Sequence, residues 1–275
     1  MKTKIANVVV KILKYILFLN KPNRFSCFFY EKIDLFKKIK TKEFDIKIST
    51  PNIINNYRAN TFFTKEPDMI NWLDRLDKDS LLMDVGANIG LYSIYAAKKN
   101  IRRVIAIEPE SQNFGILNKN IYINNLSEKI TALNIGFSDK DGLEDLFIPM
   151  FMTGAALNNL GSSEDFNKDK FKADFKQSVI TYSIDSFLEK FPEHFPSHLK
   201  IDVDGIESKI IKGANKTLDN KKLKEVIIEL NEDLKEDLEV IKILKSKGFE
   251  LSSKAQCPIA DSQFDILSNY IFIRK

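Results

Sequence analysis

The sequence contains little cysteine and histidine for its length of 275 residues. Its two cysteines, Cys27 and Cys257, lie far apart, which excludes a disulfide framework and a cysteine zinc cluster; we expect Cys257 to be a small buried residue. Two histidines, His194 and His198, are too few for a histidine-rich metal site and argue against a Ser-His-Asp hydrolase. Glycine (10 residues) and proline (8 residues) are also scarce, which excludes collagen-like and low-complexity chains. With 44% hydrophobic and 29% charged residues, the composition is typical of a folded protein, which we expect to be cytoplasmic.

The excess of positive over negative charge is confined to the N-terminus. The net charge of +4 divides into +8 for residues 1–47, which hold twelve lysines and arginines against four acids, and −4 for the other 228 residues. A nucleic-acid enzyme needs positive charge along the channel of its catalytic body, so the acidic body argues against that class. The basic segment instead favours an anionic partner surface, most simply a membrane.

Long uninterrupted hydrophobic runs are absent. Residues 5–19 are strongly apolar, but Lys11 and Lys14 interrupt them, and a membrane-spanning helix needs about 20 apolar residues. On a helix these lysines share an arc of about 100° with Asn7, and apolar side chains occupy most of the remainder. We therefore expect residues 1–49 to form a basic, amphipathic helical extension. Its first helix, residues 1–20, either lies at the inner face of the membrane with its lysines among the headgroups, or packs on the protein itself or on a second copy.

From residue 81 onward, short apolar runs alternate with helical patterns. We expect strands over residues 81–85, 103–108, 130–137, 143–149, 198–203, 226–230, 249–251 and 270–273, and helices over residues 89–99, around 114–121, 206–218 and 233–247. Such alternation predicts a mostly parallel sheet that is covered on both faces. The last two strands have no long helix between them, so they can pair antiparallel and give the sheet one reversed edge strand. Residues 151–178 are polar and weakly patterned, as in a long loop or lid.

A glycine loop lies between the first of these strands and its helix, in the stretch Asp84-Val-Gly-Ala-Asn-Ile-Gly90. Gly86 and Gly90 let the backbone turn sharply and let a ligand approach closely. The helix that follows presents unpaired N–H groups, which favour an anionic or carboxylate-bearing ligand. Glu108 ends the next strand, about 20 residues later, where a carboxylate can accept hydrogen bonds from two ribose hydroxyls. The combination indicates a cofactor that contains a nucleoside.

The acidic residue ahead of the first glycine distinguishes between nucleoside cofactors. A dinucleotide site has the pattern G-x-G-x-x-G, which leaves room for a pyrophosphate. The Asp84 carboxylate would repel a pyrophosphate, whereas it suits an ammonium or sulfonium group. The loop therefore favours S-adenosylmethionine over NAD. Two alternatives stay open, an NAD-dependent oxidoreductase and an incidental glycine turn, although the placement of Glu108 argues against the second.

Five segments in order resemble the FkbM family of S-adenosylmethionine-dependent methyltransferases. They are residues 84–90, 107–110, 138–142, 181–188 and 200–207, the last of which, Lys200-Ile-Asp-Val-Asp-Gly-Ile-Glu207, is the most specific when Ile211-Lys-Gly213 follows. The resemblance covers about residues 81–275, and Asp204 departs from it because the family commonly has glutamate there. It implies a Rossmann-like, seven-stranded class I methyltransferase sheet, and we expect the domain that contains this sheet to span residues 50–275. It also implies methyl transfer, often to a hydroxyl of a sugar or natural product.

The resemblance also implies roles for individual residues. Around the methionine part of the cofactor it places Asp84, Gly86, Asn88 and Gly90, at the ribose Glu108, and beside the adenine Asn134, Ser138 and Asp139. Residues 154–159, with Asn158 and Asn159, would cover the substrate side as part of the lid. His198 is a further candidate on that side, as a base, if its loop folds over the site.

The candidate catalytic residues follow the strand that ends near residue 203. Methyl transfer is an in-line displacement, so catalysis consists largely of positioning, but an alcohol acceptor also needs a base or a metal to lose its proton. Asp202 at the strand end and Glu207 one turn into the next helix are the candidates, unless they only cap that helix. Asp202, Glu229 and Asn231 end neighbouring strands and could form an oxygen-rich Mg²⁺ site, but we do not predict a required metal.

The sequence therefore predicts an S-adenosylmethionine-dependent O-methyltransferase. Its expected acceptor is a sugar hydroxyl in a cell-surface glycan or its precursor, and nucleic acid is not an expected partner. The alternative from another functional class is a binding module that keeps the fold and the cofactor but methylates nothing. Release of S-adenosylhomocysteine in the presence of candidate acceptors distinguishes the two. The sequence does not specify the oligomeric state.

Overall fold

The computed structural model describes residues 2–16, 24–256 and 267–275, and the chain divides into two units, Met1–Phe36 and Lys37–Lys275. The first unit contains helices α1 (Lys2–Ile16) and α2 (Arg24–Lys32), so the predicted N-terminal helix is confirmed as far as residue 16. Within the described ranges, no helix has both the length and the apolar character needed to cross a bilayer. Residues 17–20 of the predicted helix and Cys257 lie outside the described residues.

The predicted extension is not helical throughout. Strands β1 (Phe36–Lys40) and β2 (Asp45–Ser49) pair with each other in a two-stranded sheet. Ile46 and Ile48 of β2 are fully buried while Asp45 and Lys47 are exposed. The alternation has the period of a strand, because successive side chains of a strand point to opposite sides. β2 therefore contributes two isoleucines to the core of the larger unit.

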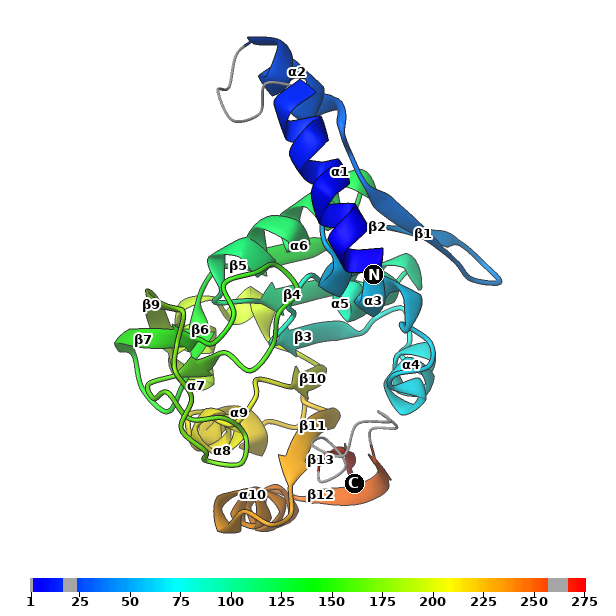
Figure 1. Ribbon diagram of the computed structural model, residues 1–275. Helices are drawn as coiled ribbons and strands as arrows, with labels where there is room; N and C mark the ends of the chain where they lie inside the picture. Colours follow the sequence, from blue (N-terminus) through cyan, green and yellow to red (C-terminus); the bar gives the residue numbers. More distant parts are fainter. Residues whose placement is uncertain (1, 17–23, 257–266) are drawn as a thin grey trace. The chain divides into compact units, whose positions relative to one another are not determined.

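The larger unit is built on a seven-stranded sheet in the order β12-β13-β11-β10-β3-β4-β5 (Figure 1). The strands are β3 (Leu81–Val85), β4 (Arg103–Ile107), β5 (Ile130–Leu133), β10 (His198–Ile201), β11 (Glu225–Asn231), β12 (Phe249–Gln256) and β13 (Leu267–Arg274). All neighbours from β11 to β5 are parallel, and β13 is antiparallel to both β11 and β12. The fold is therefore the predicted Rossmann-like sheet of seven mostly parallel strands. Its reversed strand was predicted at the edge but lies next to it, because β12 pairs outside β13.

Helices cover both faces of this sheet, and the two faces form separate hydrophobic clusters. On one face α4 (Pro67–Asp74), α5 (Leu91–Lys98) and α6 (Ser111–Ile123) pack on residues such as Leu82 and Val104. On the other face α7 (Ile184–Lys190), α8 (Glu207–Lys212), α9 (Asn215–Asp219) and α10 (Lys235–Ser246) pack on residues such as Met83 and Ile105. Adjacent residues of one strand thus serve opposite cores, which explains why these strands are apolar without interruption.

A second, four-stranded sheet has the order β6-β9-β7-β8. Its strands are β6 (Gly136–Phe137), β7 (Gly142–Ile148), β8 (Asn159–Leu160) and β9 (Phe175–Tyr182). The strand predicted over residues 130–137 is two strands, β5 and β6, in different sheets. The loop predicted over residues 151–178 is also too long, because β9 begins at Phe175. Residues 149–158 connect β7 to β8, helix α3 (Ile53–Asn60) follows β2, and a 3₁₀ turn (Pro192–His194) precedes β10.

Candidate functional site

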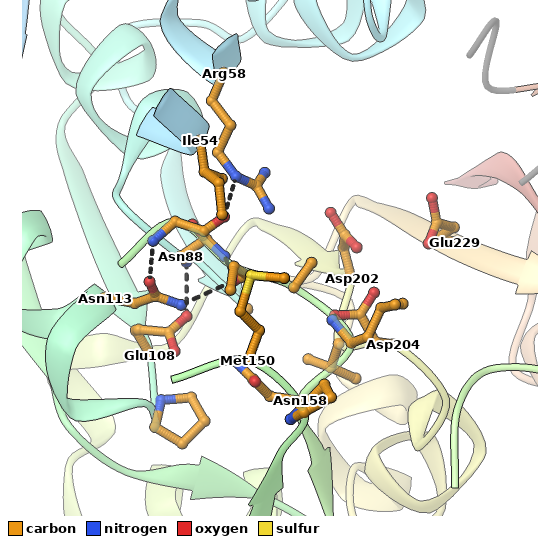
Figure 2. A pocket seen from close by; sticks show the side chains of 18 of the residues that line it. Ile54, Arg58, Asn88, Glu108, Asn113, Met150, Asn158, Asp202, Asp204 and Glu229 are labelled. Atoms are coloured by element: carbon orange, nitrogen blue, oxygen red, sulfur yellow. Dashed lines mark hydrogen bonds between the residues drawn. The ribbon is translucent and has the colours of Figure 1, made fainter. Parts of the chain in front are cut away.

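A cavity of about 590 Å³ opens at the carboxyl ends of β3, β4, β10 and β11. Its walls are the ends of these strands, helix α3 and the segment 149–158 (Figure 2). The volume lies in the range of about 300–1,000 Å³ that is usual for small-molecule sites. In an open parallel sheet, ligands bind at the point where the strand order reverses. This point lies between β3 and β10, because β4 follows on the outer side of β3 and β11 on the outer side of β10.

The glycine loop is held close to the central strands by the lack of side chains. Gly86 has a φ of +81°, and a Cβ there would come within 1.8 Å of the Asp202 carbonyl oxygen. Gly90 has a φ of +84° and would clash with Leu117 of α6 at 2.3 Å. Gly86 lines the cavity, whereas Gly90 does not and instead lets α5 begin against α6. The structure therefore assigns Gly90 to the packing of the loop, not to ligand contact.

Glu108 is the buried acid at the ribose side of the predicted cofactor site. Its carboxylate accepts the backbone N–H of Asn88 (2.7 Å) and that of Glu110 (2.8 Å), which ties the end of β4 to the glycine loop. Burial raises the pKa of Glu108 to about 8. Asn88, which has a φ of +51°, donates its side-chain amide to the Ala155 carbonyl at 2.9 Å. Both residues line the cavity, Glu108 at the position predicted for the ribose and Asn88 at that predicted for the methionine part of the cofactor.

Asp84 was predicted to face the positive charge of the cofactor, but it does not line the cavity. The residue is buried below the loop, and its Oδ2 accepts the hydroxyl proton of Ser93 at 2.6 Å. Its Oδ1 lies 3.1 Å from the Nζ of Lys200. The prediction is wrong in its partner, since the positive charge beside Asp84 belongs to a lysine of strand β10.

The three residues predicted beside the adenine lie outside the cavity wall. Asn134 is exposed, and its side-chain amide donates to the carbonyls of Glu108 (2.8 Å) and Pro109 (2.9 Å). Ser138 is buried and its backbone N–H donates to the Tyr182 carbonyl, while Asp139 is exposed. Of this region it is Pro109 that reaches the cavity, and Asn134 acts on the site through the backbone it supports.

Three carboxylates meet on the side of the cavity opposite Glu108, as Figure 2 shows. Asp202, Asp204 and Glu229 each bring an oxygen within 4.8 Å of the other two. Oxygen ligands at this spacing suit a divalent cation, but an acidic group alone does not establish one, and we assign no metal. Asn231, predicted in place of Asp204, does not line the cavity, because its side-chain oxygen accepts the backbone N–H of Asp233.

The environment separates the pKa values of these three carboxylates. Burial alone would raise the pKa of Asp202, but the ammonium groups of Lys200 and Lys65 outweigh burial and lower the pKa below its ordinary value. Burial and then the charge of Asp202 raise the pKa of Asp204 to about 6. The same two causes raise the pKa of Glu229 well above its ordinary value. Asp202 is thus ionised throughout the neutral range, whereas Asp204, whose pKa is about 6, is mostly ionised at pH 7 and is poised to take up a proton.

Glu207 was predicted as a catalytic residue, and the structure gives it a different task. Its carboxylate is buried and accepts the backbone N–H groups of Val203 (3.2 Å) and Gly205 (3.0 Å). It does not line the cavity, and it does not cap α8 either, because both N–H groups belong to residues that precede the helix. Glu207 fixes the loop that carries Asp204, whose φ of +63° is rare for a residue other than glycine. Burial, with a smaller contribution from Asp237, raises the pKa of Glu207 to about 8.

The residues predicted on the substrate side have separate locations. His198 begins β10, so it lies at the amino end of the sheet, away from the cavity, with its Nδ1 2.9 Å from the Ser197 hydroxyl and its ring against Trp72. The lid prediction for His198 is therefore wrong. Asn159 is buried in β8 and does not line the cavity. Asn158 does line it, and among the described residues no donor reaches its buried Oδ1.

Sequence reasoning missed one wall of the cavity. Ile54, Tyr57, Arg58 and Lys65 line it, although they precede the region of the family resemblance. They follow Asn52, which caps α3 by accepting the N–H of Asn55. This cap was readable in the sequence as a helix start, but nothing local indicates that the helix faces a site.

The segment 153–157 crosses the cavity as a strap that is hydrogen-bonded on both sides. From α3, Arg58 donates its Nε to the Gly154 carbonyl (2.6 Å), and Asn52 donates its side-chain amide to the Thr153 carbonyl (2.8 Å). From α6, Asn113 accepts the Gly154 N–H at 2.7 Å. At the far end the Leu157 N–H donates to Asp204 Oδ2 at 2.7 Å. The strap therefore connects the missed wall to the acidic side of the cavity.

The residues present fit S-adenosylmethionine. The buried carboxylate of Glu108, which directly follows β4, can accept hydrogen bonds from ribose hydroxyls. Gly86 has no side chain, so its backbone leaves room for the methionine chain of the cofactor. The acids across the cavity complement an ammonium and a sulfonium charge. Pyrophosphate, by contrast, would meet Asp202, Asp204 and Glu229, so a dinucleotide fits less well.

Comparisons with known proteins identify methyltransferases. The model of the methyltransferase FkbM domain matches residues 84–251. Methyltransferase sdnD of Sordaria araneosa is 25% identical over 214 residues, which cover 70% of this chain and 82% of that protein. Methyltransferase 1 of Beauveria bassiana is 28% identical over 190 residues, which cover 63% of this chain and 74% of that protein.

Solved structures also resemble the chain, at lower similarity. The precorrin-6y C5,15-methyltransferase of Geobacter metallireducens has a TM-score of 0.45 at 15% identity and covers 77% of this chain and 89% of its own. TYW2 of M. jannaschii, solved in complex with AdoMet, has a TM-score of 0.43 at 12% identity and covers 88% of each chain.

Proposed function

Since the chain belongs to the FkbM methyltransferase family and is an S-adenosylmethionine-dependent methyltransferase, we propose that its acceptor is a sugar hydroxyl in a cell-surface glycan or its precursor. The observation that carries this proposal is the group of Asp202, Asp204 and Glu229 on the cavity side opposite Glu108. Closely spaced carboxylates suit an acceptor with several hydroxyl donors, because each oxygen can accept more than one hydrogen bond.

In this proposal the two sides of the cavity have different ligands. Glu108 accepts hydrogen bonds from the ribose hydroxyls, and Gly86 and Asn88 border the methionine chain. The cofactor supplies a methyl group that its sulfonium activates. Asn158, whose Oδ1 is buried without a donor among the described residues, then offers a hydrogen-bond acceptor from the strap.

Asp202 and Asp204 divide the work on the acceptor. Asp202 stays ionised, faces the transferred methyl group and accepts a hydrogen bond from the attacking hydroxyl, which orients its oxygen. Asp204 takes up the proton, because a base is most effective when its pKa is close to the working pH. The pKa of about 6 supports this assignment over Asp202. The strap holds Asp204 through the Leu157 N–H, so the base and the cover of the site are connected.

We further propose that α1 brings the enzyme to the inner face of the membrane, where a lipid-linked saccharide would be presented. The support is the basic N-terminal sequence and the helical conformation of residues 2–16, which places Lys11 and Lys14 on one side of the helix. A peripheral cytoplasmic location follows from this proposal.

The test is release of S-adenosylhomocysteine from S-adenosylmethionine with free sugars, nucleotide sugars and lipid-linked saccharides as acceptors. We expect turnover with at least one saccharide. We expect Asp204→Asn to lower kcat by about 10²–10⁴-fold, the usual contribution of a general base, with a smaller change in KM. Asp204→Glu, the residue common in the family, should recover part of the rate.

Two outcomes would count against the proposal. Turnover only with hydroxyl compounds that are not saccharides would refute the sugar acceptor but would leave O-methylation as the reaction. A rate for Asp204→Asn within about threefold of the wild type would remove Asp204 as the base. Asp139→Asn, at an exposed position outside the cavity, serves as the matched control and should keep full activity.

A further inference from the structure

We propose that Lys200 is a positioning residue that presents the Asp202 carboxylate to the reacting methyl group. The inference rests on the proposed role of Asp202 and adds a residue that sequence reasoning placed only within a motif. Lys200 lies in the central strand β10, and its side chain is only 1% exposed. Lysine is almost never buried to this extent unless its charge is paired.

The ammonium group of Lys200 lies between two carboxylates. Its Nζ is 3.1 Å from Asp84 Oδ1 and 3.3 Å from Asp202 Oδ2. Asp84 is the direct neighbour of Lys200 across the parallel pair of β3 and β10, and Asp202 follows two residues along the chain. The register therefore brings all three side chains to one face of the sheet, because strand residues alternate between faces.

Asp84 fixes the position of this ammonium group. Its other oxygen accepts the Ser93 hydroxyl at 2.6 Å, and both residues are buried on regular elements, β3 and α5. Asp84 thereby fixes Lys200 on the side away from the cavity, and the other ion pair of Lys200, with Asp202, lies on the cavity side. The Nζ of Lys200 is nearly as close to Asp202 as to Asp84. The position of the ammonium group therefore serves both carboxylates, and the need to neutralise Asp84 does not explain it alone.

Asp202 in turn lies where the cofactor loop passes. Its carbonyl oxygen occupies the space that a Cβ of Gly86 would need, at 1.8 Å, and its side chain is 28% exposed to the cavity. A carboxylate this close to solvent would sample several rotamers without a partner. The contact with Lys200 selects one rotamer beside the glycine loop. The lowered pKa of Asp202, to which Lys200 contributes, is consistent with this contact.

The experiment compares two cofactor analogues that differ at the methyl position. S-adenosylhomocysteine has a neutral sulfur there, whereas sinefungin carries a charged amino group in place of the methyl. The ratio of their dissociation constants, measured by calorimetry on the full-length chain, reports negative charge beside that position. Four proteins are compared: the wild type, Asp202→Asn, the double variant Asp84→Asn with Lys200→Met, and the triple variant.

The double variant is chosen because it removes one positive and one negative charge together. Lys200→Met alone would leave Asp84 buried without its counter-charge, at a cost that could prevent folding. The double variant keeps the net charge and a side chain of similar length. Lys212→Met, at an exposed position of α8, controls for loss of a lysine and should leave the ratio unchanged.

We expect the wild type to prefer sinefungin, and Asp202→Asn to reduce that preference by about tenfold, the effect of one hydrogen bond between charged groups. In the double variant the preference should already be reduced, and adding Asp202→Asn should change it by less than about twofold. A tenfold effect of Asp202→Asn in both backgrounds would overturn the role of Lys200 and leave the proposed function intact.

The remaining outcomes separate the two hypotheses further. If Asp202→Asn changes the ratio in neither background, Asp202 does not face the methyl position, and both its proposed role and that of Lys200 are wrong. If the wild type binds neither analogue, the cofactor site itself is wrong. If the double variant does not fold, Lys200→Arg takes its place, because it keeps the buried positive charge opposite Asp84 but changes the geometry of its contact with Asp202. A tenfold effect of Asp202→Asn in the Lys200→Arg background would equally overturn the inference.

Discussion

Glu108 illustrates how a single carboxylate can serve both the fold and the ligand. Its oxygens accept two backbone N–H groups, and burial raises its pKa to about 8. A carboxylate oxygen has two acceptor positions, so each can also accept a ribose hydroxyl. The ionised form is the better acceptor, and it becomes dominant only as the pH rises through the pKa.

The affinity for S-adenosylhomocysteine should therefore depend on pH. We expect calorimetry to show affinity that rises from about pH 6 to about pH 9, by up to about tenfold per pH unit below the pKa. Glu108→Gln should bind more weakly and lose most of this dependence. An equally steep rise in Glu108→Gln would show that another group controls binding.

Glu207 leads to a prediction about stability. Its pKa is raised from 4.5 to about 8 in the folded protein, so folding favours its protonated form. The resulting stabilisation is fully present below about pH 4.5 and is lost as the pH rises through about 8. Glutamine keeps the acceptor oxygen without the charge. In urea unfolding, the stability of Glu207→Gln relative to the wild type should therefore increase by a few kcal/mol between about pH 5 and about pH 9.

A stability difference between Glu207→Gln and the wild type that stays constant with pH would contradict this assignment. The exposed Glu189→Gln, in α7, provides the control, since its charge is in water in both the folded and the unfolded chain. Its relative stability should not change over the same range.

At the scale of elements, the strap 153–157 depends on one glycine. Gly154 has a φ of +81°, and a Cβ there would lie 2.2 Å from Asn55 Oδ1 of α3. Gly154→Ala should therefore destabilise the protein by about 1–3 kcal/mol or displace the strap, which would raise the KM for the acceptor. Denaturant unfolding and steady-state kinetics measure the two effects.

Gly115 is the matched control within the same protein. It lies inside α6, and a Cβ there has no atom within 4 Å. Gly115→Ala should be neutral or stabilise the protein by about 0.5–1 kcal/mol, because alanine restricts the unfolded chain. Similar destabilisation by both substitutions would refute the proposed contact between the strap and α3.

The predictability of the elements follows from how local their causes are. The sheet strands could be predicted because β3 and β4 are apolar on both faces. The glycine loop could be predicted because Gly86 and Asn88 follow one strand and Glu108 follows the next, with a single helix between the two strands. β9 was missed because it is half exposed and polar between Phe175 and Ser178. Its position depends on pairing with β7, which no local pattern encodes.

The site was predictable to the same extent. Residues that follow a strand end, such as Asp202, could be placed at the cavity from the sequence, but the contact of Asp84 could not, because its partner Lys200 is adjacent in the sheet but far away in the sequence. Arg58 and Lys65 were missed because they precede the segments that resemble the family, and the contact of Arg58 with the Gly154 carbonyl joins residues far apart in the sequence. Asp204 was noted only as a departure from the family, although its carboxylate is central to the acidic group.

At the scale of the whole molecule, charge is divided between the N-terminal segment and the rest. The first 47 residues carry +8 and the remainder −4. If α1 lies on a membrane, the full chain should bind vesicles that contain about 30% phosphatidylserine and bind less as salt rises, because screening weakens the attraction. Lys11→Glu together with Lys14→Glu should weaken sedimentation with these vesicles by about thirtyfold or more, at about 1 kcal/mol for each lysine lost near the surface.

The control for this measurement is neutral phosphatidylcholine. Equal binding to both kinds of vesicle, or binding that the two substitutions leave unchanged, would contradict the proposal that the lysines of α1 bind an anionic membrane. The methyltransferase assignment would be unaffected, since it depends on residues 84–251.

The central claim is that one cavity binds the adenosyl cofactor between Glu108 and the group of Asp202, Asp204 and Glu229. A crystal structure of the protein with S-adenosylhomocysteine tests it most directly. We predict ribose hydroxyls within hydrogen-bonding distance of Glu108 and the cofactor sulfur directed toward Asp202. A ligand bound elsewhere, or one whose ribose makes no contact with Glu108, would contradict it.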